Sequence, residues 1–379
     1  MPIMTKENPF IVGKYLSPEY FCDRDEEVVF LSKQVHNGRN VALISPRRLG
    51  KTGLINHFFH QADVQHQFYT FFIDIYATSS LTELVYLLGK AIFEQLKPRT
   101  TAWRERFLQV VASLRLGFKL DALTGEPTFD IGLGDIQSPE VTLSEIFRYL
   151  EEADRPCIVA IDEFQQVAEY VEKNTEALLR THIQKCKQTL FIFSGSKRHM
   201  MTQMFNSPSK PFYQSAMGMT LQPLNRAVYA AFARHLFEQN GRTLAEGVVE
   251  QVYDYTEGYT WFMQMLMNEL FAITPQGGTC TTDLIIQART NILQAQDGLY
   301  RELMANLSIK QRQLLQAIAR EGRVNGITSA AFIRRHHLPS ASSVQSAARP
   351  LIENDILTQT DGTYRLYDFF LSQWLAEVY

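Results

Sequence analysis

The sequence is poor in cysteine and has no long apolar run. Its four cysteines, Cys22, Cys157, Cys186 and Cys280, are far apart and form no Cys-x-x-Cys or Cys/His cluster, so we expect no zinc site. No uninterrupted apolar segment is long enough to span a bilayer, and the first ten residues lack the apolar core of a signal peptide. We therefore expect a cytoplasmic location and no membrane partner.

Strong charge of either sign is also missing. The net charge of -3 gives no overall attraction to nucleic acid or membrane, although a local basic patch is not excluded. The composition, 45% hydrophobic and 20% charged, is typical of a globular protein. With 379 residues, the chain is too long for one compact core, and two or three domains are expected.

The most informative stretch is Asn40-Val-Ala-Leu-Ile-Ser-Pro-Arg-Arg-Leu-Gly-Lys-Thr52. Residues 41–44 predict a buried parallel strand, and Gly50-Lys51-Thr52 opens a helix. A strand, a loop of phosphate size and a helix start form a P-loop, whose backbone N–H groups wrap phosphates. We therefore expect the nucleotide to be bound by Ser45, Pro46, Arg47, Arg48, Leu49, Gly50, Lys51, Thr52 and Gly53.

Within this loop the side chains have separate expected roles. Lys51 can reach the outer phosphates, and the Thr52 hydroxyl can ligate Mg²⁺. Ser45 stands where the P-loop pattern begins with glycine. Because serine tolerates positive φ poorly, either the loop differs slightly in shape or Ser45 has ordinary dihedral angles.

A second motif, Pro156-Cys-Ile-Val-Ala-Ile-Asp-Glu163, predicts a buried strand that ends in two carboxylates. Such a pair is costly to bury unless a cation or water uses it. In a P-loop site, Asp162 would hold Mg²⁺ through water, and Glu163 would polarise the attacking water. An exposed acidic loop start is the alternative, which the upstream P-loop disfavours because ligands gather at the carboxyl ends of parallel strands.

A third apolar strand, from Leu190, ends in Ser194-Gly-Ser196. A polar side chain on the strand beside the acidic one is placed to contact the γ-phosphate or the attacking water. We take Ser194 as a catalytic candidate together with Lys51 and Glu163, and Ser196 as its neighbour candidate. A simple Ser-Gly turn is the alternative for each serine.

Four segments together resemble the archaeal/bacterial ATPase family, a STAND-type branch of the AAA-like P-loop ATPases related to the initiator ATPases of DNA replication. These segments are Phe21-Cys-Asp-Arg24-Asp-Glu26, Ser45-Pro-Arg-Arg-Leu-Gly-Lys-Thr52, Ile161-Asp-Glu163 and Phe193-Ser-Gly-Ser196. The resemblance covers nearly the whole chain and implies ATP or ADP with Mg²⁺ as ligands. It departs at Ser45, in place of the usual glycine, and at Thr260, where the family usually has proline.

The resemblance also makes Phe10, Phe21 and Arg24 candidates for the adenine pocket. For the two phenylalanines, the alternative is that they only anchor the N-terminal segment to the core.

The pattern of strands and helices predicts an α/β fold. We expect a P-loop NTPase parallel sheet with helices on both faces, followed by a helical lid and a C-terminal winged helix. The expected domains are an ATPase core over 1–224, including the adenine-side segment, a lid over 225–306, where the pattern is all helical, and a winged helix over 307–379. Alternating apolar residues and a Thr-Gly turn predict a β-hairpin inserted at 113–135.

The winged helix raises the question of DNA binding. We expect helices capped by Ser308 and Thr328, and a wing with its turn at Asp361-Gly362. Residues 321–349 contain four arginines and one glutamate, and the third helix would expose residues that can reach DNA. The exposed residues are Ser342, Ser343, Gln345, Ser346 and Arg349. DNA contact through residues 340–350 and packing on the ATPase domain both remain open.

Together these patterns predict Mg²⁺-dependent ATP binding and slow ATP hydrolysis, used as a nucleotide-controlled conformational switch. The alternative is a DNA-binding winged-helix regulator that holds the nucleotide as a structural ligand. The Glu163 carboxylate favours hydrolysis, because a site that only binds nucleotide has no need of it. A protein partner or a second copy of the chain remains open as well.

Overall fold

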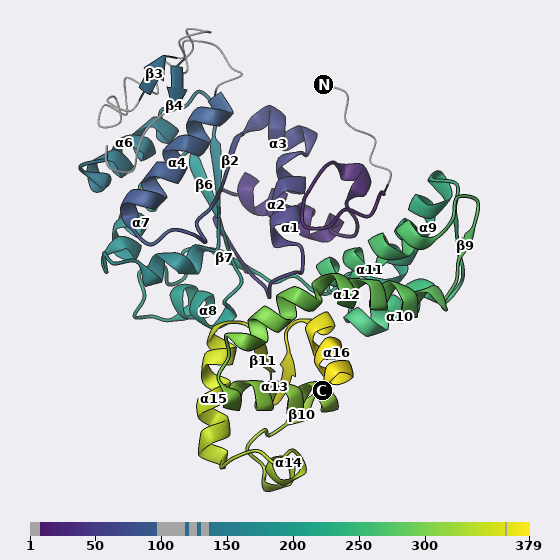
Figure 1. Ribbon diagram of the computed structural model, residues 1–379. Helices are drawn as coiled ribbons and strands as arrows, with labels where there is room; N and C mark the ends of the chain where they lie inside the picture. The colour runs from purple at the N-terminus through teal and green to yellow at the C-terminus, as the bar shows by residue number, and fades with distance from the viewer. Residues whose placement is uncertain (1–7, 97–117, 121–126, 130–135, 361) are drawn as a thin grey trace. The chain divides into compact units, whose positions relative to one another are not determined.

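A computed structural model describes residues 8–96, 118–120, 127–129, 136–360 and 362–379 (Figure 1). The chain forms two compact units, residues 13–224 and residues 225–379 joined by the N-terminal segment through Val12. The backbone therefore passes between the units twice, after Val12 and after Leu224. The N-terminal segment is predicted from sequence to belong to the ATPase core, whereas its described part, residues 8–12, belongs to the C-terminal unit.

The first unit is built on a five-stranded sheet in the order β2-β5-β6-β1-β7, in which all neighbours are parallel. Its strands are β1 (Val41–Ile44), β2 (Tyr69–Asp74), β5 (Cys157–Asp162), β6 (Thr189–Gly195) and β7 (Met217–Met219). All six residues of β5 are buried, which explains its continuous apolar run. The carboxyl ends of β5, β6 and β1 therefore lie side by side.

Helices cover both faces of this sheet. In Figure 1, α1, α2 and α3 lie on one side of the strands, and α4, α6 and α7 lie on the other. Alternate strand residues such as Phe71, Val159 and Phe193 share one buried cluster with residues of α4, α6, α7 and α8. The predicted α/β class and two-sided parallel sheet are confirmed. The helical elements of this unit are η1 (Pro18–Tyr20), α1 (Asp25–His36), α2 (Lys51–Phe59), α3 (Ala62–Gln67), α4 (Leu81–Leu96), α6 (Pro139–Glu151), η4 (Phe164–Glu169), α7 (Thr175–Ile183) and α8 (Arg198–Asn206).

A hairpin interrupts the order of strands and helices where the sequence predicts one. Strands β3 (Phe118–Leu120) and β4 (Pro127–Phe129) pair in antiparallel register, with Phe118 opposite Phe129. The remainder of the 113–135 prediction, including its turn, lies outside the described residues.

The C-terminal unit begins with the lid helices α9 (Arg226–Gln239), α10 (Val248–Thr256), α11 (Thr260–Ile273) and α12 (Leu284–Ala305). The prediction that 225–306 is all helical is wrong in one place. Strands β8 (Thr243–Leu244) and β9 (Thr279–Cys280) form a short parallel pair. Gly241 and Gly277 turn the chain at positive φ, and the Gly277 N–H donates to the Gly241 carbonyl at 2.8 Å, which brings the two loops together.

The winged helix follows. It contains α13 (Ile309–Glu321), β10 (Val324–Asn325), α14 (Ala330–Arg335), α15 (Ala341–Glu353), β11 (Leu357–Thr360), β12 (Thr363–Leu366) and α16 (Phe369–Val378). Ser308 caps α13 in a capping box, as expected, but Ser329 rather than Thr328 caps α14. Strands β11 and β12 form the expected wing, and β10 adds a third strand that the sequence analysis did not predict.

The lid and the winged helix share one core. The Phe262 ring of α11 is fully buried and lies 4.9 Å from the Phe369 ring and 5.6 Å from the Phe370 ring of α16. The Trp374 indole N–H donates to Asp297 of α12 at 2.9 Å. The expected division at residue 306 is thus no boundary between independent cores. No helix within the described ranges is long and apolar enough to cross a membrane.

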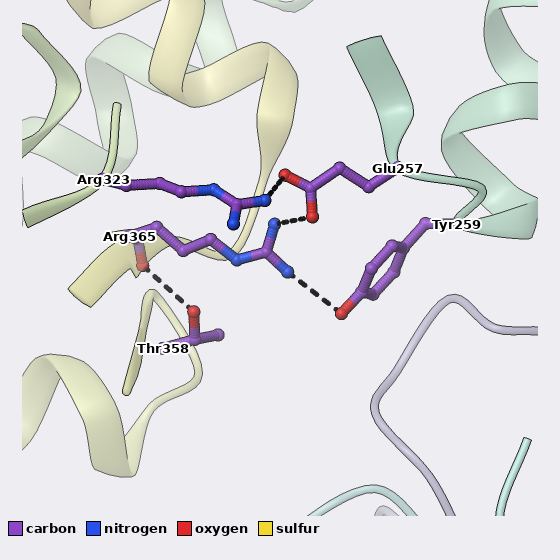
Figure 2. A network of polar contacts seen from close by, with 5 residues as sticks. All are labelled: Glu257, Tyr259, Arg323, Thr358 and Arg365. Atoms are coloured by element: carbon purple, nitrogen blue, oxygen red, sulfur yellow. Dashed lines mark hydrogen bonds and ion pairs between the residues drawn. The ribbon is translucent and has the colours of Figure 1, made fainter. Parts of the chain in front are cut away.

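A polar network supports the same interface (Figure 2). Glu257, directly after α10, accepts hydrogen bonds from Arg323 and from Arg365 of β12. Arg365 also donates to the Tyr259 hydroxyl at 3.1 Å, and its guanidinium lies 5.2 Å from the Phe369 ring centroid. One lid carboxylate therefore binds two arginines of the winged helix.

Candidate functional site

The loop between β1 and α2 has the backbone of a phosphate-binding turn. Arg48 and Gly50 lie in the left-handed region, at φ 63° and 90°, which turns the chain into the start of α2. Ser45 could either change the shape of the loop or have ordinary dihedral angles. It is not among the residues with positive φ, so the structure shows ordinary dihedral angles. Its buried hydroxyl accepts a hydrogen bond from the Leu221 N–H at 2.6 Å. The side chain that departs from the pattern therefore fastens the loop to the segment after β7.

Lys51 points its ammonium back at the same loop. The side chain is only 6% exposed and donates to the carbonyls of Ser45 at 2.9 Å and Pro46 at 3.0 Å. Burial keeps the charge close to the loop backbone rather than in solvent. A phosphate seated in the loop would meet both the backbone N–H groups and this ammonium.

Asp162 joins the end of β5 to the start of α2. Its Oδ2 accepts a hydrogen bond from the Thr52 hydroxyl at 2.6 Å, and its Oδ1 accepts one from the Glu163 N–H at 3.0 Å. Asp162 is 4% exposed. The two residues that the sequence analysis named as metal ligands are therefore in direct contact.

Glu163 lies next to this pair in a left-handed conformation, at φ 56° and ψ 40°. Its Oε2 accepts hydrogen bonds from the Ser196 hydroxyl at 2.6 Å and from the Gln165 amide. Burial opposes ionisation, but these two bonds and the charges of Lys51 and Arg47 outweigh it and lower the pKa of Glu163. The carboxylate is therefore ionised at neutral pH, as an acceptor of a proton from water must be.

A third carboxylate, Asp74, stands at the end of β2 in register with Asp162. Its pKa is raised, first by burial and then by the negative charges of Asp162 and Glu163, although a hydrogen bond from the Tyr76 N–H acts in the opposite direction. The ends of β2 and β5 thus carry a concentrated negative field. Such a field favours a cation at this edge of the sheet.

The two candidate serines, Ser194 near the end of β6 and Ser196 directly after it, differ in their contacts. Ser194 is fully buried, and its hydroxyl has no hydrogen-bond partner among the residues that the structure describes. Ser196 donates to Glu163 and accepts from the Arg47 Nε at 3.3 Å. The structure therefore brings Ser196, rather than Ser194, to the candidate general base.

Arg47 connects the loop to the acidic edge. Besides its bond to Ser196, its guanidinium lies 5.4 Å from the ring centroid of Tyr76, beyond the end of β2. The neighbouring Arg48 holds the left-handed backbone position described above. Both arginines were predicted from sequence as nucleotide-binding residues. The contact that joins Arg47 to Glu163 through Ser196 depends on the fold and could not be predicted.

The N-terminal box packs against the loop from the other side. Arg24 is 4% exposed and donates to the Leu49 carbonyl at 3.2 Å and to Glu27 at 2.8 Å. The Phe21 ring stacks on His57 at 4.3 Å, and a Cβ added at Gly53 would lie 3.3 Å from it. Arg24 and Phe21 are thus placed to hold the shape of the loop and of the first turn of α2.

Phe10, the third adenine candidate, lies elsewhere. It is fully buried in the C-terminal unit, 5.5 Å from Phe237 and 6.0 Å from Phe271 between ring centroids. The alternative interpretation, in which Phe10 anchors its segment to a core, fits these contacts. That core belongs to the C-terminal unit and not, as expected, to the ATPase core, and no local pattern shows this because the aromatic partners are more than two hundred residues away along the chain.

The basic cluster of the winged helix is largely paired with carboxylates. Arg323 binds Glu257, Arg335 and His336 bind Glu321, and Arg349 binds Glu353 at 3.0 Å. The count of four arginines against Glu321 alone therefore overstated the positive charge available to a ligand, because Glu257 and Glu353 also pair with them. The expected face of α15 is nevertheless present, with Ser342, Gln345, Ser346 and Arg349 exposed.

Comparison with known families decides what this site belongs to. A model described as an ATPase domain predominantly from Archaea matches residues 21–266, and a model of a probable winged helix domain matches residues 298–377. The chain belongs to this archaeal-type ATPase family. The first match spans more than half of the chain and contains the loop, the acidic strand and β6. The protein is therefore an ATPase, which binds and hydrolyses nucleotide.

Solved structures resemble the ATPase over nearly its whole length. A Walker-type ATPase of Pyrococcus abyssi matches with a TM-score of 0.66 and 18% identity, over 97% of this chain and 99% of that one. The ORC2 protein of Aeropyrum pernix, in ADPNP and ADP complexes, gives 0.57 and 14%, over 98% and 96%. The ORC1 protein of the same organism, in complex with DNA, gives 0.53 and 12%, over 99% and 97%. At these identities the likeness shows the fold alone, and no curated protein sequence matches.

Two residues of the ATPase site escaped the sequence analysis. Gln165 contacts Glu163, and Gly195 lies where an added Cβ would come within 2.4 Å of the Gln165 amide oxygen. The available signal was local: a glutamine two residues after the carboxylate pair, and a glycine between Ser194 and Ser196. Neither pattern predicts that the two residues meet.

Proposed function

We propose that this ATPase requires Mg²⁺, hydrolyses ATP slowly and uses the nucleotide to control the arrangement of its two units. The observation that carries the proposal is the convergence of three groups at one edge of the sheet. These are the Thr52 hydroxyl, the Asp162 carboxylate bonded to it and the ionised Glu163 carboxylate beside them. A site for binding alone would not need the third group.

The loop supplies the nucleotide contacts in this proposal. Residues 45–53 wrap the phosphates with backbone N–H groups, and Lys51 neutralises the outer phosphates. Arg24 keeps the loop in place through the Leu49 carbonyl, and Phe21 lines the adenine side near Gly53. Arg47 adds a positive charge between the loop and the acidic edge.

The oxygen atoms at Thr52 and Asp162 fit Mg²⁺, which prefers hydroxyl, carboxylate, phosphate and water ligands. No three His, Cys, Asp or Glu side chains converge to hold a metal within the described part of the chain. That agrees with a Mg²⁺ held by one carboxylate and one hydroxyl together with nucleotide phosphates. When bound, Mg²⁺ would supply charge neutralisation at the phosphates.

Glu163 acts on water in this scheme. Its carboxylate, held by Ser196, accepts a proton from or orients the attacking water. Ser196 is better placed than Ser194 to take part, because it bonds both Glu163 and Arg47. Ser194 remains a proposed contact for the γ-phosphate.

Turnover and affinity measured together test the proposal. Lys51→Ala is expected to lose both ATP binding and turnover, whereas Glu163→Gln keeps ATP binding and lowers kcat by about 10²–10⁴-fold. Omission of Mg²⁺ should abolish turnover. Lys185→Ala and Glu140→Gln, at exposed positions, are matched controls with unchanged kinetics.

Tight ATP binding without turnover in the unaltered protein would contradict the proposal and favour the regulator with a structural nucleotide. Full activity of Glu163→Gln would remove Glu163 from the reaction.

For the switch, we propose that the lid and the winged helix respond to nucleotide as one body. The shared core around Phe262 and the Glu257 network support this, because both connect lid helices to the winged helix. Small-angle X-ray scattering of Glu163→Gln is expected to give different radii of gyration with MgATP and with MgADP. Identical scattering with both nucleotides would contradict a switch.

A second proposed function is DNA binding through residues 340–350, favoured by the exposed polar face of α15. Removing residues 301–379 is a poor test, because it takes Phe369 and Phe370 out of the core around Phe262. We instead expect Gln345→Ala with Arg349→Ala, in the full chain, to weaken duplex binding at least tenfold by fluorescence anisotropy. Arg39→Ala, in the other unit, serves as the control.

Equal affinity of the double variant and the unaltered protein, or an unaltered protein that does not bind duplex, would contradict this second function.

A further inference from the structure

Gln165 has a buried amide that meets the candidate general base. The side chain is 1% exposed, and its Nε2 donates to Oε2 of Glu163. The Ser196 hydroxyl, directly after β6, donates to the same oxygen. Two donors from different parts of the fold, one on η4 and one just beyond the end of β6, therefore hold one carboxylate oxygen. The bonds fix the plane of the carboxylate and leave Oε1 outside this pair of contacts.

We propose that Gln165 is a positioning residue for ATP hydrolysis, which orients the Glu163 carboxylate toward the attacking water. The inference rests on the proposed role of Glu163 and adds a residue that acts through it. Gln165 itself contacts neither nucleotide nor water in this proposal.

The backbone explains how Gln165 reaches Glu163. Glu163 adopts the left-handed conformation as the residue directly before η4, and the Gln166 N–H donates back to the Glu163 carbonyl at 2.9 Å. A non-glycine residue in this region is uncommon and strained, so the surrounding contacts must hold it there. The tight turn brings the side chain two positions later back onto the carboxylate.

Gly195 provides the space for the amide. An added Cβ at this position would lie 2.4 Å from the Gln165 Oε1 and 2.5 Å from the Met201 Cγ and Sδ. Gly195 is not among the residues with positive φ, so the requirement is for space rather than for backbone freedom. A larger residue at position 195 would push the Gln165 amide away from Glu163.

The arrangement also has a cost that packing alone does not explain. The Gln165 Oε1 is buried and has no hydrogen-bond partner among the described residues. A buried acceptor without a partner is unfavourable, and an apolar side chain of the same length would avoid it. What glutamine provides at this position, and an apolar side chain does not, is the amide N–H that donates to Glu163.

Gln165→Met keeps the length of the side chain and removes the donor. It is expected to lower kcat at least tenfold while KM and the ATP affinity stay within about twofold, because the loop contacts are untouched. Gly195→Ala, which displaces the amide without changing it, should give the same split. Gln166→Met, the adjacent and half-buried glutamine of η4, is the matched control with unchanged kinetics.

A double variant that combines Gln165→Met with Glu163→Gln distinguishes a positioning role of Gln165 from a general structural role. In the Glu163→Gln background, Gln165→Met should cause no further loss of residual turnover, since the group that it positions is already gone. A crystal structure of nucleotide-free Gln165→Met should show the Glu163 carboxylate turned from its direction in the unaltered protein, which is a readout independent of activity.

An unchanged kcat in Gln165→Met, or an equal loss in Gln166→Met, would overturn the inference. The same holds for an undisturbed Glu163 in the variant's crystal structure. If Glu163→Gln turns over at the unaltered rate, the proposed function of Glu163 fails instead. The two failures are therefore distinguishable.

Discussion

At the scale of single residues, the site shows how neighbours set the charge of similar carboxylates. Glu163 directly follows β5, Asp74 ends the adjacent strand β2, and burial of each favours the neutral acid. Glu163 has two side-chain donors and two nearby cations, and its pKa falls. Asp74 has one backbone donor and faces two negative charges, and its pKa rises. Two carboxylates at one edge of the sheet therefore have pKa values shifted in opposite directions.

Asp74→Asn is expected to stabilise the ligand-free protein at pH 7. A pKa that is raised in the folded state means that the ionised carboxylate disfavours folding, and this cost grows as pH rises from the unfolded pKa to the folded pKa. The gain should be less than about 1 kcal/mol, because Asp74 is only partly buried and its side chain is still largely accessible to solvent. It should vanish below the pKa of the unfolded chain, where Asp74 is neutral in both states. Urea unfolding at pH 7 and at low pH measures it.

Asp63→Asn, at an exposed position on α3, serves as the control for this measurement. A loss of stability at pH 7 in Asp74→Asn would show that the repulsion described here is absent.

At the scale of elements, α16 closes the core of the lid as well as that of its own module. Phe262→Ala should cost about 3–5 kcal/mol of unfolding free energy, because the ring is fully buried between α11 and α16. Guanidinium unfolding of the full chain measures the change. Leu299→Ala on α12, at a leucine that is 64% exposed, should change stability by less than about 0.5 kcal/mol. Equal effects of the two variants would contradict the shared core.

The elements that could be predicted from sequence are those with a pattern longer than one turn or one strand. The strands β1, β5 and β6 are apolar runs with polar residues at or just beyond their carboxyl ends. Because the strands are parallel, Lys51, Asp162 and Glu163 could be expected at the same edge of the sheet. The strands β8, β9 and β10 have two residues each, which is too few to show the alternation of apolar and polar residues that identifies a strand. They form because tertiary contacts place two loops together.

The contacts of Gln165, Ser45 and Phe10 could not be predicted for a related reason. Each depends on residues that are distant in the chain and on a register that no local pattern records. Ser45 stood out as a departure, but its bond to the Leu221 N–H required β7 to lie beside β1. Local rules predict which side chains reach an edge, and the packing of the elements decides which of them touch.

At the scale of the whole molecule, the Glu257 network joins two modules that the sequence separates. A double-mutant cycle of Glu257→Gln and Arg365→Met should give a coupling of at least about 1 kcal/mol in unfolding free energy, since both side chains are mostly buried and hydrogen-bonded. The matched pair Arg226–Asp254, with both side chains exposed, should give less than about 0.5 kcal/mol. Equal coupling in the two cycles would show that the network adds nothing to the interface.

The two backbone passages between the units, after Val12 and after Leu224, have a mechanical consequence. A body tethered at one point can turn about any axis through that point. A second covalent tether removes two of these three rotations and leaves the line through both tethers as the axis. The N-terminal segment, anchored by Phe10 in the C-terminal unit, is that second tether. The nucleotide-driven motion that we propose would therefore be a rotation about this single axis, and cutting the chain near residue 12 would free the C-terminal unit to rotate about all three.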